Sequence, residues 1–212
     1  MAKGFLIAAL NFADVPGHEF HEWQDQEHIP ERLAVPGFIN AQRWIGADDP
    51  KISVNTYDLE SLEVLKAPEY LAFSYENSSA WSKRVIGNCK RLMRVAADQI
   101  APGDAIQPEG AGALLFNALN ILAEHDAEFH AWYTQEHLPA LATVPGTLCA
   151  RFFRSGDTRS THRYLAAYHL TTTDVPDSSA WRKAADTPWS ARVRPHFRDR
   201  VRIICRRYAP AE

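Results

Sequence analysis

The 212-residue sequence lacks the features that mark several large classes of protein. Its three cysteines, Cys89, Cys149 and Cys205, lie far apart and form no Cys-x-x-Cys pair. Neither a disulfide framework nor a structural zinc site is therefore expected, and a reducing, cytoplasmic setting is the default. No apolar run approaches the roughly twenty residues that a membrane span needs.

Motifs for nucleotides and for nucleophilic catalysis are also missing. The sequence has no Gly-x-Gly-x-x-Gly or Walker loop and no Gly-x-Ser-x-Gly elbow. The net charge of -3 and the pI near 6.3 favour neither a nucleic-acid nor a membrane partner. The arginine-rich C-terminal stretch is interpreted as the polar face of a helix and a strand. With 46% hydrophobic and 23% charged residues, the composition is that of a globular protein.

Two segments of the sequence are copies of one another. Residues 20–37 read FHEWQDQEHIPERLAVPG and residues 129–146 read FHAWYTQEHLPALATVPG, with ten of eighteen positions identical at a spacing of 109. Further matches follow in the same order, including Tyr57 with Tyr168 and Trp81 with Trp189. We interpret the chain as a tandem duplication with repeats at 1–103 and 110–212. The seam at 100–112 has the proline and glycine content of a linker.

Each repeat predicts the same series of elements. An apolar strand opens it, a helix follows and ends at a Val-Pro-Gly sequence, and two strands, a second helix and a last strand complete it. The expected strands are 5–12, 38–45, one containing Tyr57, and 92–96, and then 113–121, 147–154, one containing Tyr168, and 201–205. This β-α-β-β-α-β order is ferredoxin-like. The predicted fold is α+β, with two such units packed into an intramolecular barrel.

The sequence resembles the dimeric α/β-barrel superfamily, and within it the EthD-like branch. The resemblance rests on Trp23-x-x-x-Glu27-His28-Ile29-Pro30, which leads into Pro36-Gly37-Phe38, and on its echo at 132–146. The resemblance implies a pocket between sheet and helices that accepts a small, often aromatic-derived molecule. It also implies a range of activities, from cofactor-free monooxygenases and muconolactone isomerases to haem-dependent chlorite dismutases, and fold alone does not select among them.

The first helix of each repeat carries the candidate catalytic residues. On a helical wheel Trp23 and Glu27 share a face, with His28 on its flank. Burial of a carboxylate among aromatic side chains is costly unless it is paired, and an imidazole is a natural partner. We therefore predict that His28 with Glu27, and His137 with Glu136, perform acid–base chemistry.

A structural interpretation of the same motif stays open. A histidine near the end of a helix interacts favourably with the helix dipole, and the glutamate can bond a backbone amide. A structural element also survives duplication whether or not both copies are catalytic. Because the first copy keeps more ionisable groups on its helix, we expect His28 to matter more than His137.

Other residues are candidates for binding the substrate. Tyrosines on the third strands would face the pocket, and arginines near the ends of the second strands would neutralise a substrate carboxylate. The predicted substrate-binding residues are His21, Trp23, Arg43 and Tyr57 in the first repeat and His130, Trp132, Arg151 and Tyr168 in the second. No metal ligands are expected, because His21 and His28 are two helical turns apart and no third ligand has helical spacing.

The expected function is that of a cofactor-independent enzyme, with a small, ring-cleavage-type acid as substrate and isomerisation or hydrolysis as the reaction. The alternatives are a non-catalytic EthD-like binding protein, a cofactor-free monooxygenase and a haem enzyme of the same fold. The expected partner is a small-molecule substrate, without nucleic acid or membrane, and barrel exteriors could join copies into a homo-oligomer.

Overall fold

Eight strands form one closed antiparallel barrel in the order β1-β3-β2-β8-β5-β7-β6-β4. The computed structural model describes residues 3–209, so the outermost ends of the predicted repeats, 1–2 and 210–212, lie outside it. The strands are β1 (Gly4–Asn11), β2 (Phe38–Gly46), β3 (Ile52–Leu59), β4 (Lys90–Ala101), β5 (Ala113–Ile121), β6 (Thr147–Arg154), β7 (Tyr164–Leu170) and β8 (Phe197–Arg207).

The barrel is made of two ferredoxin-like sheets. The first half contributes β4-β1-β3-β2 and the second half contributes β8-β5-β7-β6, which is the same internal order. Pairing of β2 with β8 and of β4 with β6 closes the ring between the halves. The predicted fold class, two βαββαβ units that form a dimeric α/β-barrel within one chain, is confirmed.

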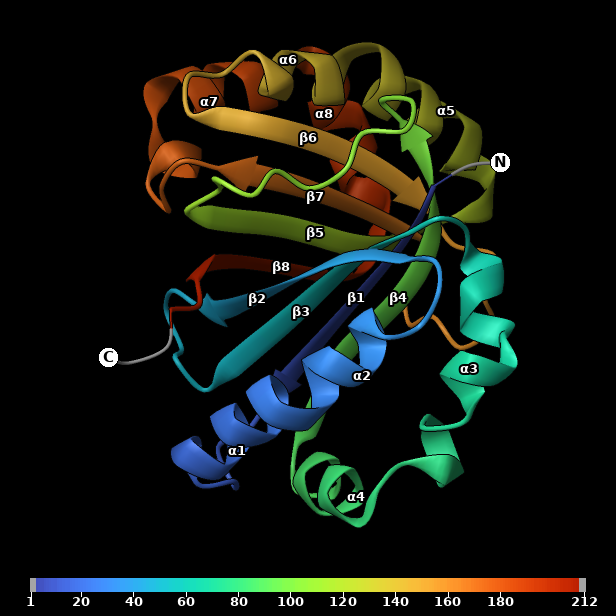
Figure 1. The fold of residues 1–212 in the computed structure, drawn as a ribbon. Coiled ribbons are helices and arrows are strands. Elements are labelled where there is room, and N and C mark those ends of the chain that lie inside the picture. Colours follow the sequence, from blue (N-terminus) through green and yellow to red (C-terminus); the bar gives the residue numbers. More distant parts are fainter. Residues whose placement is uncertain (1–2, 210–212) are drawn as a thin grey trace.

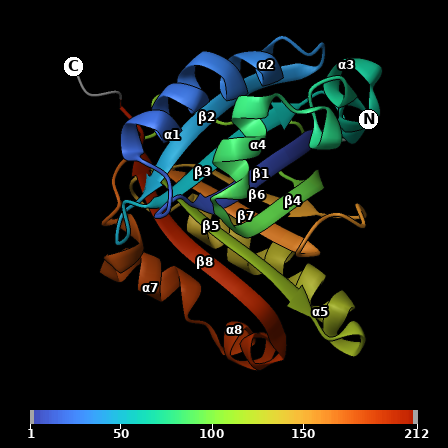
Figure 2. The ribbon, with the colours of Figure 1, turned by 90° about the horizontal axis from the view of Figure 1, so that it is seen from below.

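Helices cover the outside of the barrel on two opposite sides. Those of the first half lie along one side and those of the second half along the other (Figures 1 and 2). They are α1 (Gly17–Trp23), α2 (Ile29–Leu33), α3 (Pro68–Leu71), α4 (Ala80–Gly87), α5 (Asp126–Trp132), α6 (Leu138–Ala142), α7 (Ser179–Ala185) and α8 (Pro188–Val193). Within residues 3–209, no helix has the length and hydropathy to cross a membrane.

Alternation along the strands divides the buried side chains into an interior layer and two outer layers. In β1, Phe5 and Ile7 face the barrel interior, whereas Leu6 packs under the helices of the first half. In β3, Val54 faces inward and Tyr57 faces the helices. Successive strand residues point to opposite faces of the sheet. Each half thus presents its outward strand face to its own helices, and these two interfaces contain the cavities described below.

The first long helix of each half ends as the Val-Pro-Gly sequence predicts. Gly37 and Gly146 adopt φ values of +93° and +92°, which L-residues with side chains rarely accept. A Cβ atom on Gly37 would also lie 2.5 Å from Cγ2 of Val64. Glycine is therefore required where the chain turns from helix into β2.

Three details differ from the expected elements. The predicted second helix of the second half is two helices, α7 and α8, because Thr187 and Ser190 form a capping box and Pro188 begins a new helix. The last strands, β4 and β8, extend further at both ends than predicted. Strand β4 continues into the predicted seam and ends at Ala101.

The rest of the seam is packed against one end of the barrel. The backbone N–H of Gln107 donates to Oδ2 of Asp58 at 2.7 Å, and Oγ1 of Thr56 donates to the Gln107 side chain at 2.7 Å. Nε2 of Gln42 donates to the carbonyl of Pro108 at 3.0 Å. Gln107 and Ala111 of the segment with linker composition are thus buried, whereas most of its other residues are exposed.

Candidate functional site

Each half contains one cavity between its sheet and its helices. Cavity 1, in the first half, has a volume of about 360 Å³, and cavity 2, in the second half, has about 240 Å³. Small-molecule sites usually occupy about 300–1,000 Å³. The first helix of each half supplies one wall, and the predicted His28 and His137 line cavities 1 and 2, respectively.

A π-helical turn interrupts that first helix in both halves. The turns are η1 (Gln24–His28), between α1 and α2, and η5 (Tyr133–His137), between α5 and α6. Pro30 and Pro139 follow shortly after and lack the N–H that a regular helix would use. Such turns are rare in proteins as a whole, and those that occur often lie at functional sites. The turn covers the Gln-Glu-His part of the repeated motif, so the motif marks an irregular helix.

His28 is held against Trp23 in the wall of cavity 1. The two ring centroids are 4.6 Å apart, and Nδ1 of His28 is buried without a hydrogen-bond partner. Burial, together with the charges of Arg32 and Arg43, lowers the pKa of His28 well below its ordinary value. The imidazole is therefore neutral near pH 7, the form that accepts a proton.

The neighbouring glutamates contact helix caps instead of the histidines. Oε1 of Glu27 accepts hydrogen bonds from Ser79 at 2.6 Å and from Ser82 at 2.8 Å, and Ser79 is the N-cap of α4. In the second half, Thr187, the N-cap of α8, donates to Glu136 at 2.6 Å. Adjacent helical residues do not face each other. The structure thus does not form the expected Glu–His pairs.

Polar side chains of β3 and the π-turn form the floor of cavity 1. Nδ2 of Asn55 donates to Oε1 of Gln24 at 2.9 Å. The hydroxyl of Tyr57 interacts with the side chain of Asn55, whereas two further buried atoms, Nε2 of Gln24 and Oγ of Ser53, have no partner. Buried polar groups are nearly always hydrogen-bonded, so these atoms are suited to a bound molecule or ordered water.

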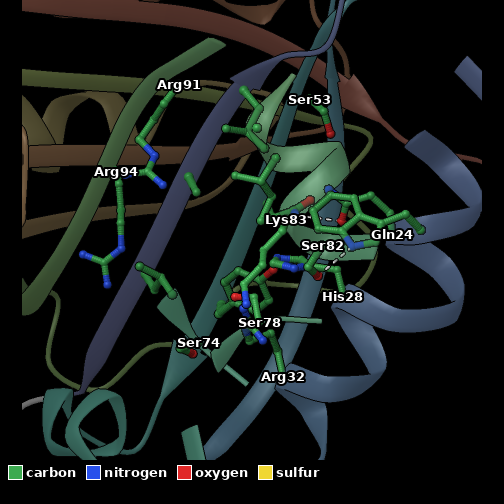
Figure 3. Close-up of a pocket in the computed structure, with 18 of the residues that line it drawn as sticks. Gln24, His28, Arg32, Ser53, Ser74, Ser78, Ser82, Lys83, Arg91 and Arg94 are labelled. Carbon is green, nitrogen blue, oxygen red and sulfur yellow. Dashed lines mark hydrogen bonds between the residues drawn. The ribbon is translucent and has the colours of Figure 1, made fainter. Parts of the chain in front are cut away.

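The rim of cavity 1 is positively charged. Arg32 lies one helical turn after His28, with its guanidinium 4.9 Å from the ring centroid of Phe73. Figure 3 shows Arg91 and Arg94 on the side of β4, opposite Arg32 and His28 on the helices. Lys83 also lines the cavity, and the described lining residues include no aspartate or glutamate. Glu31 and Asp157 pair with Arg32 and Arg94 at 3.5 Å and 3.4 Å, so the charge that favours an anionic ligand comes chiefly from Lys83 and Arg91.

Cavity 2 has lost most of this arrangement. Tyr133 occupies the place of Gln24, and its hydroxyl lies 3.0 Å from that of Tyr168, the counterpart of Tyr57. Leu141 takes the place of Arg32. His137 stacks on Trp132 with ring centroids 4.2 Å apart, and burial lowers its pKa to about 3. Because Tyr57 also lines cavity 1, the larger side chain that distinguishes cavity 2 is Tyr133 in place of Gln24.

The predicted His21 and Arg43 lie outside cavity 1. The guanidinium of Arg43 bonds Asp25 and lies 2.9 Å from Nδ1 of His21 and 3.7 Å from the ring centroid of Tyr208. Tyr208 also stacks on His21. These residues attach the C-terminal segment to α1 and do not line cavity 1, although the charge of Arg43 acts on His28.

The predicted Arg151 lies on the other face of the sheet from both cavities. It is fully buried in the barrel interior, where it bonds Asp58 at 2.5 Å. By strand register its counterpart in the first half is Gln42, not Arg43. A shift of one residue reverses the face of a strand, so the two predicted arginines point in opposite directions.

The remaining predicted binding residues differ in their access to a ligand. Trp23 lines cavity 1 and donates from Nε1 to Ser82 at 2.9 Å. Trp132 is buried beneath His137, and its Nε1 has no partner. His130 contacts Phe152, with ring centroids 6.2 Å apart, and does not line cavity 2.

Sequence reasoning missed several residues of cavity 1, although two signals were present. Ser53, Asn55 and Tyr57 alternate along β3 and therefore share a face. Arg32 is four residues after His28 and lies on the same side of the helix. The two-residue period of a strand gives the first signal, and the spacing of four residues on a helix gives the second.

The described residues do not suit a metal or haem. Within residues 3–209, no group of three or more His, Cys, Asp or Glu side chains could hold a metal ion. A histidine that ligates iron almost always donates its other ring N–H to a carboxylate or carbonyl. Nδ1 of both His28 and His137 is buried without a carboxylate or carbonyl partner among the described residues.

Comparison with known proteins identifies the fold alone. No family model and no curated protein matches this sequence. Among solved structures, a proposed monooxygenase from Fusobacterium nucleatum subsp. nucleatum matches with a TM-score of 0.64 at 10% identity, over 98% of this chain and 93% of that chain. An anthrone oxidase-like protein matches with a TM-score of 0.64 at 14% identity, over 97% and 92%. A proposed chlorite dismutase matches with a TM-score of 0.68 at 10% identity, over 99% and 96%.

Proposed function

We propose that the protein is an enzyme that binds a small, anionic, aromatic or enolisable molecule in cavity 1 and removes a proton from it with His28. The observation that carries this proposal is a neutral imidazole in the wall of a positively charged cavity. A neutral imidazole accepts a proton, and nearby cations stabilise the negative charge that remains on the substrate. Arg32 is the cation nearest in sequence, one turn along the helix.

Oxidation by dioxygen is the reaction that we favour after this proton transfer. It is supported by the fold shared with a proposed monooxygenase and with an anthrone oxidase-like protein. In such a reaction His28 takes one proton from a CH2 group, and the carbanion passes electrons to O2 as a C–O bond forms. His28 gives this proton to the resulting peroxide anion, and the neutral imidazole then removes the second C–H proton from the hydroperoxide as its O–O bond breaks. The products are a carbonyl group and water, and His28 returns its proton to the leaving hydroxide.

The isomerase or hydrolase expected from the sequence is the second candidate. It would begin with the same proton transfer and consume no oxygen. The guanidinium of Arg32 supports this second candidate, because a guanidinium binds a substrate carboxylate with two hydrogen bonds. The EthD-like assignment belongs to the same proposal, because its motif coincides with the π-turn that carries His28.

The test measures oxygen uptake by the full chain with anthrone and with carboxylated, enolisable phenols as probes. We expect His28→Asn to lower kcat by about 10²–10⁴-fold, the usual effect of removing a general base. His18→Asn is the matched control, because His18 is exposed on the same helix, and it should keep full turnover.

The outcomes separate the candidates. Turnover that needs His28 without oxygen uptake would favour the isomerase or hydrolase. Equal rates for His28→Asn and the wild type, with unchanged melting temperatures, would contradict catalysis by His28. Saturable binding of a probe without any turnover would favour the non-catalytic binding protein.

A further inference from the structure

Arginines of the last strand line cavity 2, which the proposed function does not use. Arg200 and Arg202 lie on the helix-facing side of β8, and Arg182 and Arg194 reach the same cavity from the helical segments. Among the described residues that line it, Asp186 is the one carboxylate. The cavity therefore gathers four guanidinium groups around a single acidic side chain.

Among the described residues, the contacts leave three of these four charges, those of Arg182, Arg200 and Arg202, without a counter-charge. Arg194 bonds Asp186 at 2.6 Å, and Arg182 donates to the carbonyl of Asp177 at 2.5 Å. Nε of Arg200 donates to Oδ1 of Asn117 at 2.9 Å, which is an uncharged acceptor. Within residues 3–209, neither Arg200 nor Arg202 forms an ion pair.

Neighbouring groups indicate that these guanidinium groups lie close together around the cavity. Burial and the charge of Arg202 lower the pKa of Arg200. Burial raises the pKa of Tyr168 well above its ordinary value, and Arg202 and Arg200 are the cations that oppose the rise. Arg200 and Arg202 are both exposed, so solvent screens part of their mutual repulsion, and a bound anion would relieve the rest.

We infer that cavity 2 binds a small oxyanion of more than one negative charge, of the kind carried by a phosphate ester, through Arg200 and Arg202. The planar guanidinium group matches pairs of phosphate or carboxylate oxygens. The volume of cavity 2, about 240 Å³, restricts the ligand to a small molecule. This site is separate from cavity 1 and does not depend on chemistry at His28.

The test is a titration of the full chain with inorganic pyrophosphate, measured by calorimetry at a constant ionic strength of about 0.15 M, where weak surface attraction is screened. We expect saturable binding that Arg202→Gln weakens by about tenfold or more, as expected for the loss of a charge-assisted hydrogen bond. Arg206→Gln is the matched control, since Arg206 is an exposed arginine of the same strand outside cavity 2. It should change the affinity by less than about twofold.

Three results would overturn the inference. The first is an absence of saturable binding at this ionic strength. The second is equal weakening by Arg202→Gln and Arg206→Gln, which would indicate attraction to net charge. The third is weakening by Arg94→Gln with no effect of Arg202→Gln, which would place the anion in cavity 1. An unchanged affinity of His28→Asn for pyrophosphate would show that this site is distinct from the proposed active site.

Discussion

At the scale of single residues, the histidines of the repeated motif are more deeply buried than a role at a helix end requires. Both pack against a tryptophan ring, His137 stacked on it and His28 tilted to it, and both have a lowered pKa because burial disfavours the charged form. The neutral state is thus built into the motif in both halves. What differs is the surrounding cavity, because Gln24 and Arg32 in the first half correspond to Tyr133 and Leu141 in the second.

Burial of His137 predicts a particular loss of stability in acid. Its pKa is about 3 in the folded chain, against an ordinary value of 6.5. Between these pH values the unfolded chain binds a proton that the folded chain does not, so stability falls as the pH decreases. His137→Asn should reduce the dependence of the unfolding free energy on pH by up to about 1.4 kcal/mol per pH unit. Urea unfolding at pH 5.5 and 4.5 measures this, and parallel curves for variant and wild type would contradict it.

At the scale of the elements, the π-turn is fixed to a helix that follows much later in the chain. Glu27 bonds the N-cap residue of α4, and Glu136 bonds that of α8. A carboxylate near a helix N-terminus is also favoured by the helix dipole. The glutamate of the motif therefore positions the turn that carries the histidine, in both halves alike.

Removal of either glutamate should destabilise the protein to a similar extent. We expect Glu27→Ala and Glu136→Ala each to lower the unfolding free energy by about 1–3 kcal/mol, because hydroxyl groups lose a charged acceptor. Denaturant unfolding of both variants provides the comparison. If Glu27→Ala abolished turnover while stability and the affinity for substrate stayed normal, Glu27 would belong to the catalytic residues predicted from the sequence.

At the scale of the whole molecule, a buried ion pair joins the two halves inside the barrel. Arg151 of β6 and Asp58 of β3 are almost fully buried, and both also contact the seam, at Ala105 and Gln107. Rings of Phe5 and Phe153 flank the guanidinium at 4.7 Å and 5.2 Å from their centroids. The pair thus sits where both sheets and the linker meet.

Breaking this pair should be costly, and removing both charges should be less so. We expect Arg151→Met to lower the unfolding free energy by about 3–5 kcal/mol, since it leaves Asp58 buried without its counter-charge. Adding Asp58→Asn should restore part of this loss. Thermal and denaturant unfolding of the single and double variants measure the difference. A stable Arg151→Met variant with impaired substrate binding would instead favour the binding role predicted for Arg151.

The fold was predictable from the sequence because the internal copy defines the order of the elements. The Val-Pro-Gly sequences marked the helix ends, and strand alternation placed Tyr57 and Tyr168 on the helix-facing side. The functional site was harder to predict from the sequence. Its geometry depends on the parity of strand register, which separates Arg43 from Arg151, and on contacts across the fold such as Glu27 with Ser79. The repeat spacing of 109 already matches Arg151 with Gln42, whereas a contact such as that of Glu27 with Ser79 is not encoded in local spacing.

Closure of the ring has a consequence for how the chain behaves if it is divided. In the intact protein β2 and β4 each pair with a strand of the other half. Alone, residues 1–103 would present both as unpaired sheet edges, which recruit further strands. We expect this fragment to self-associate in sedimentation, and residues 110–212, supplied in equal amount, to suppress that association by occupying both edges. A fragment that stays monomeric would show that the first half protects its own edges. The covalent linkage of the halves thus acts as protection against aggregation, because each copy is always made together with the partner that covers its edges.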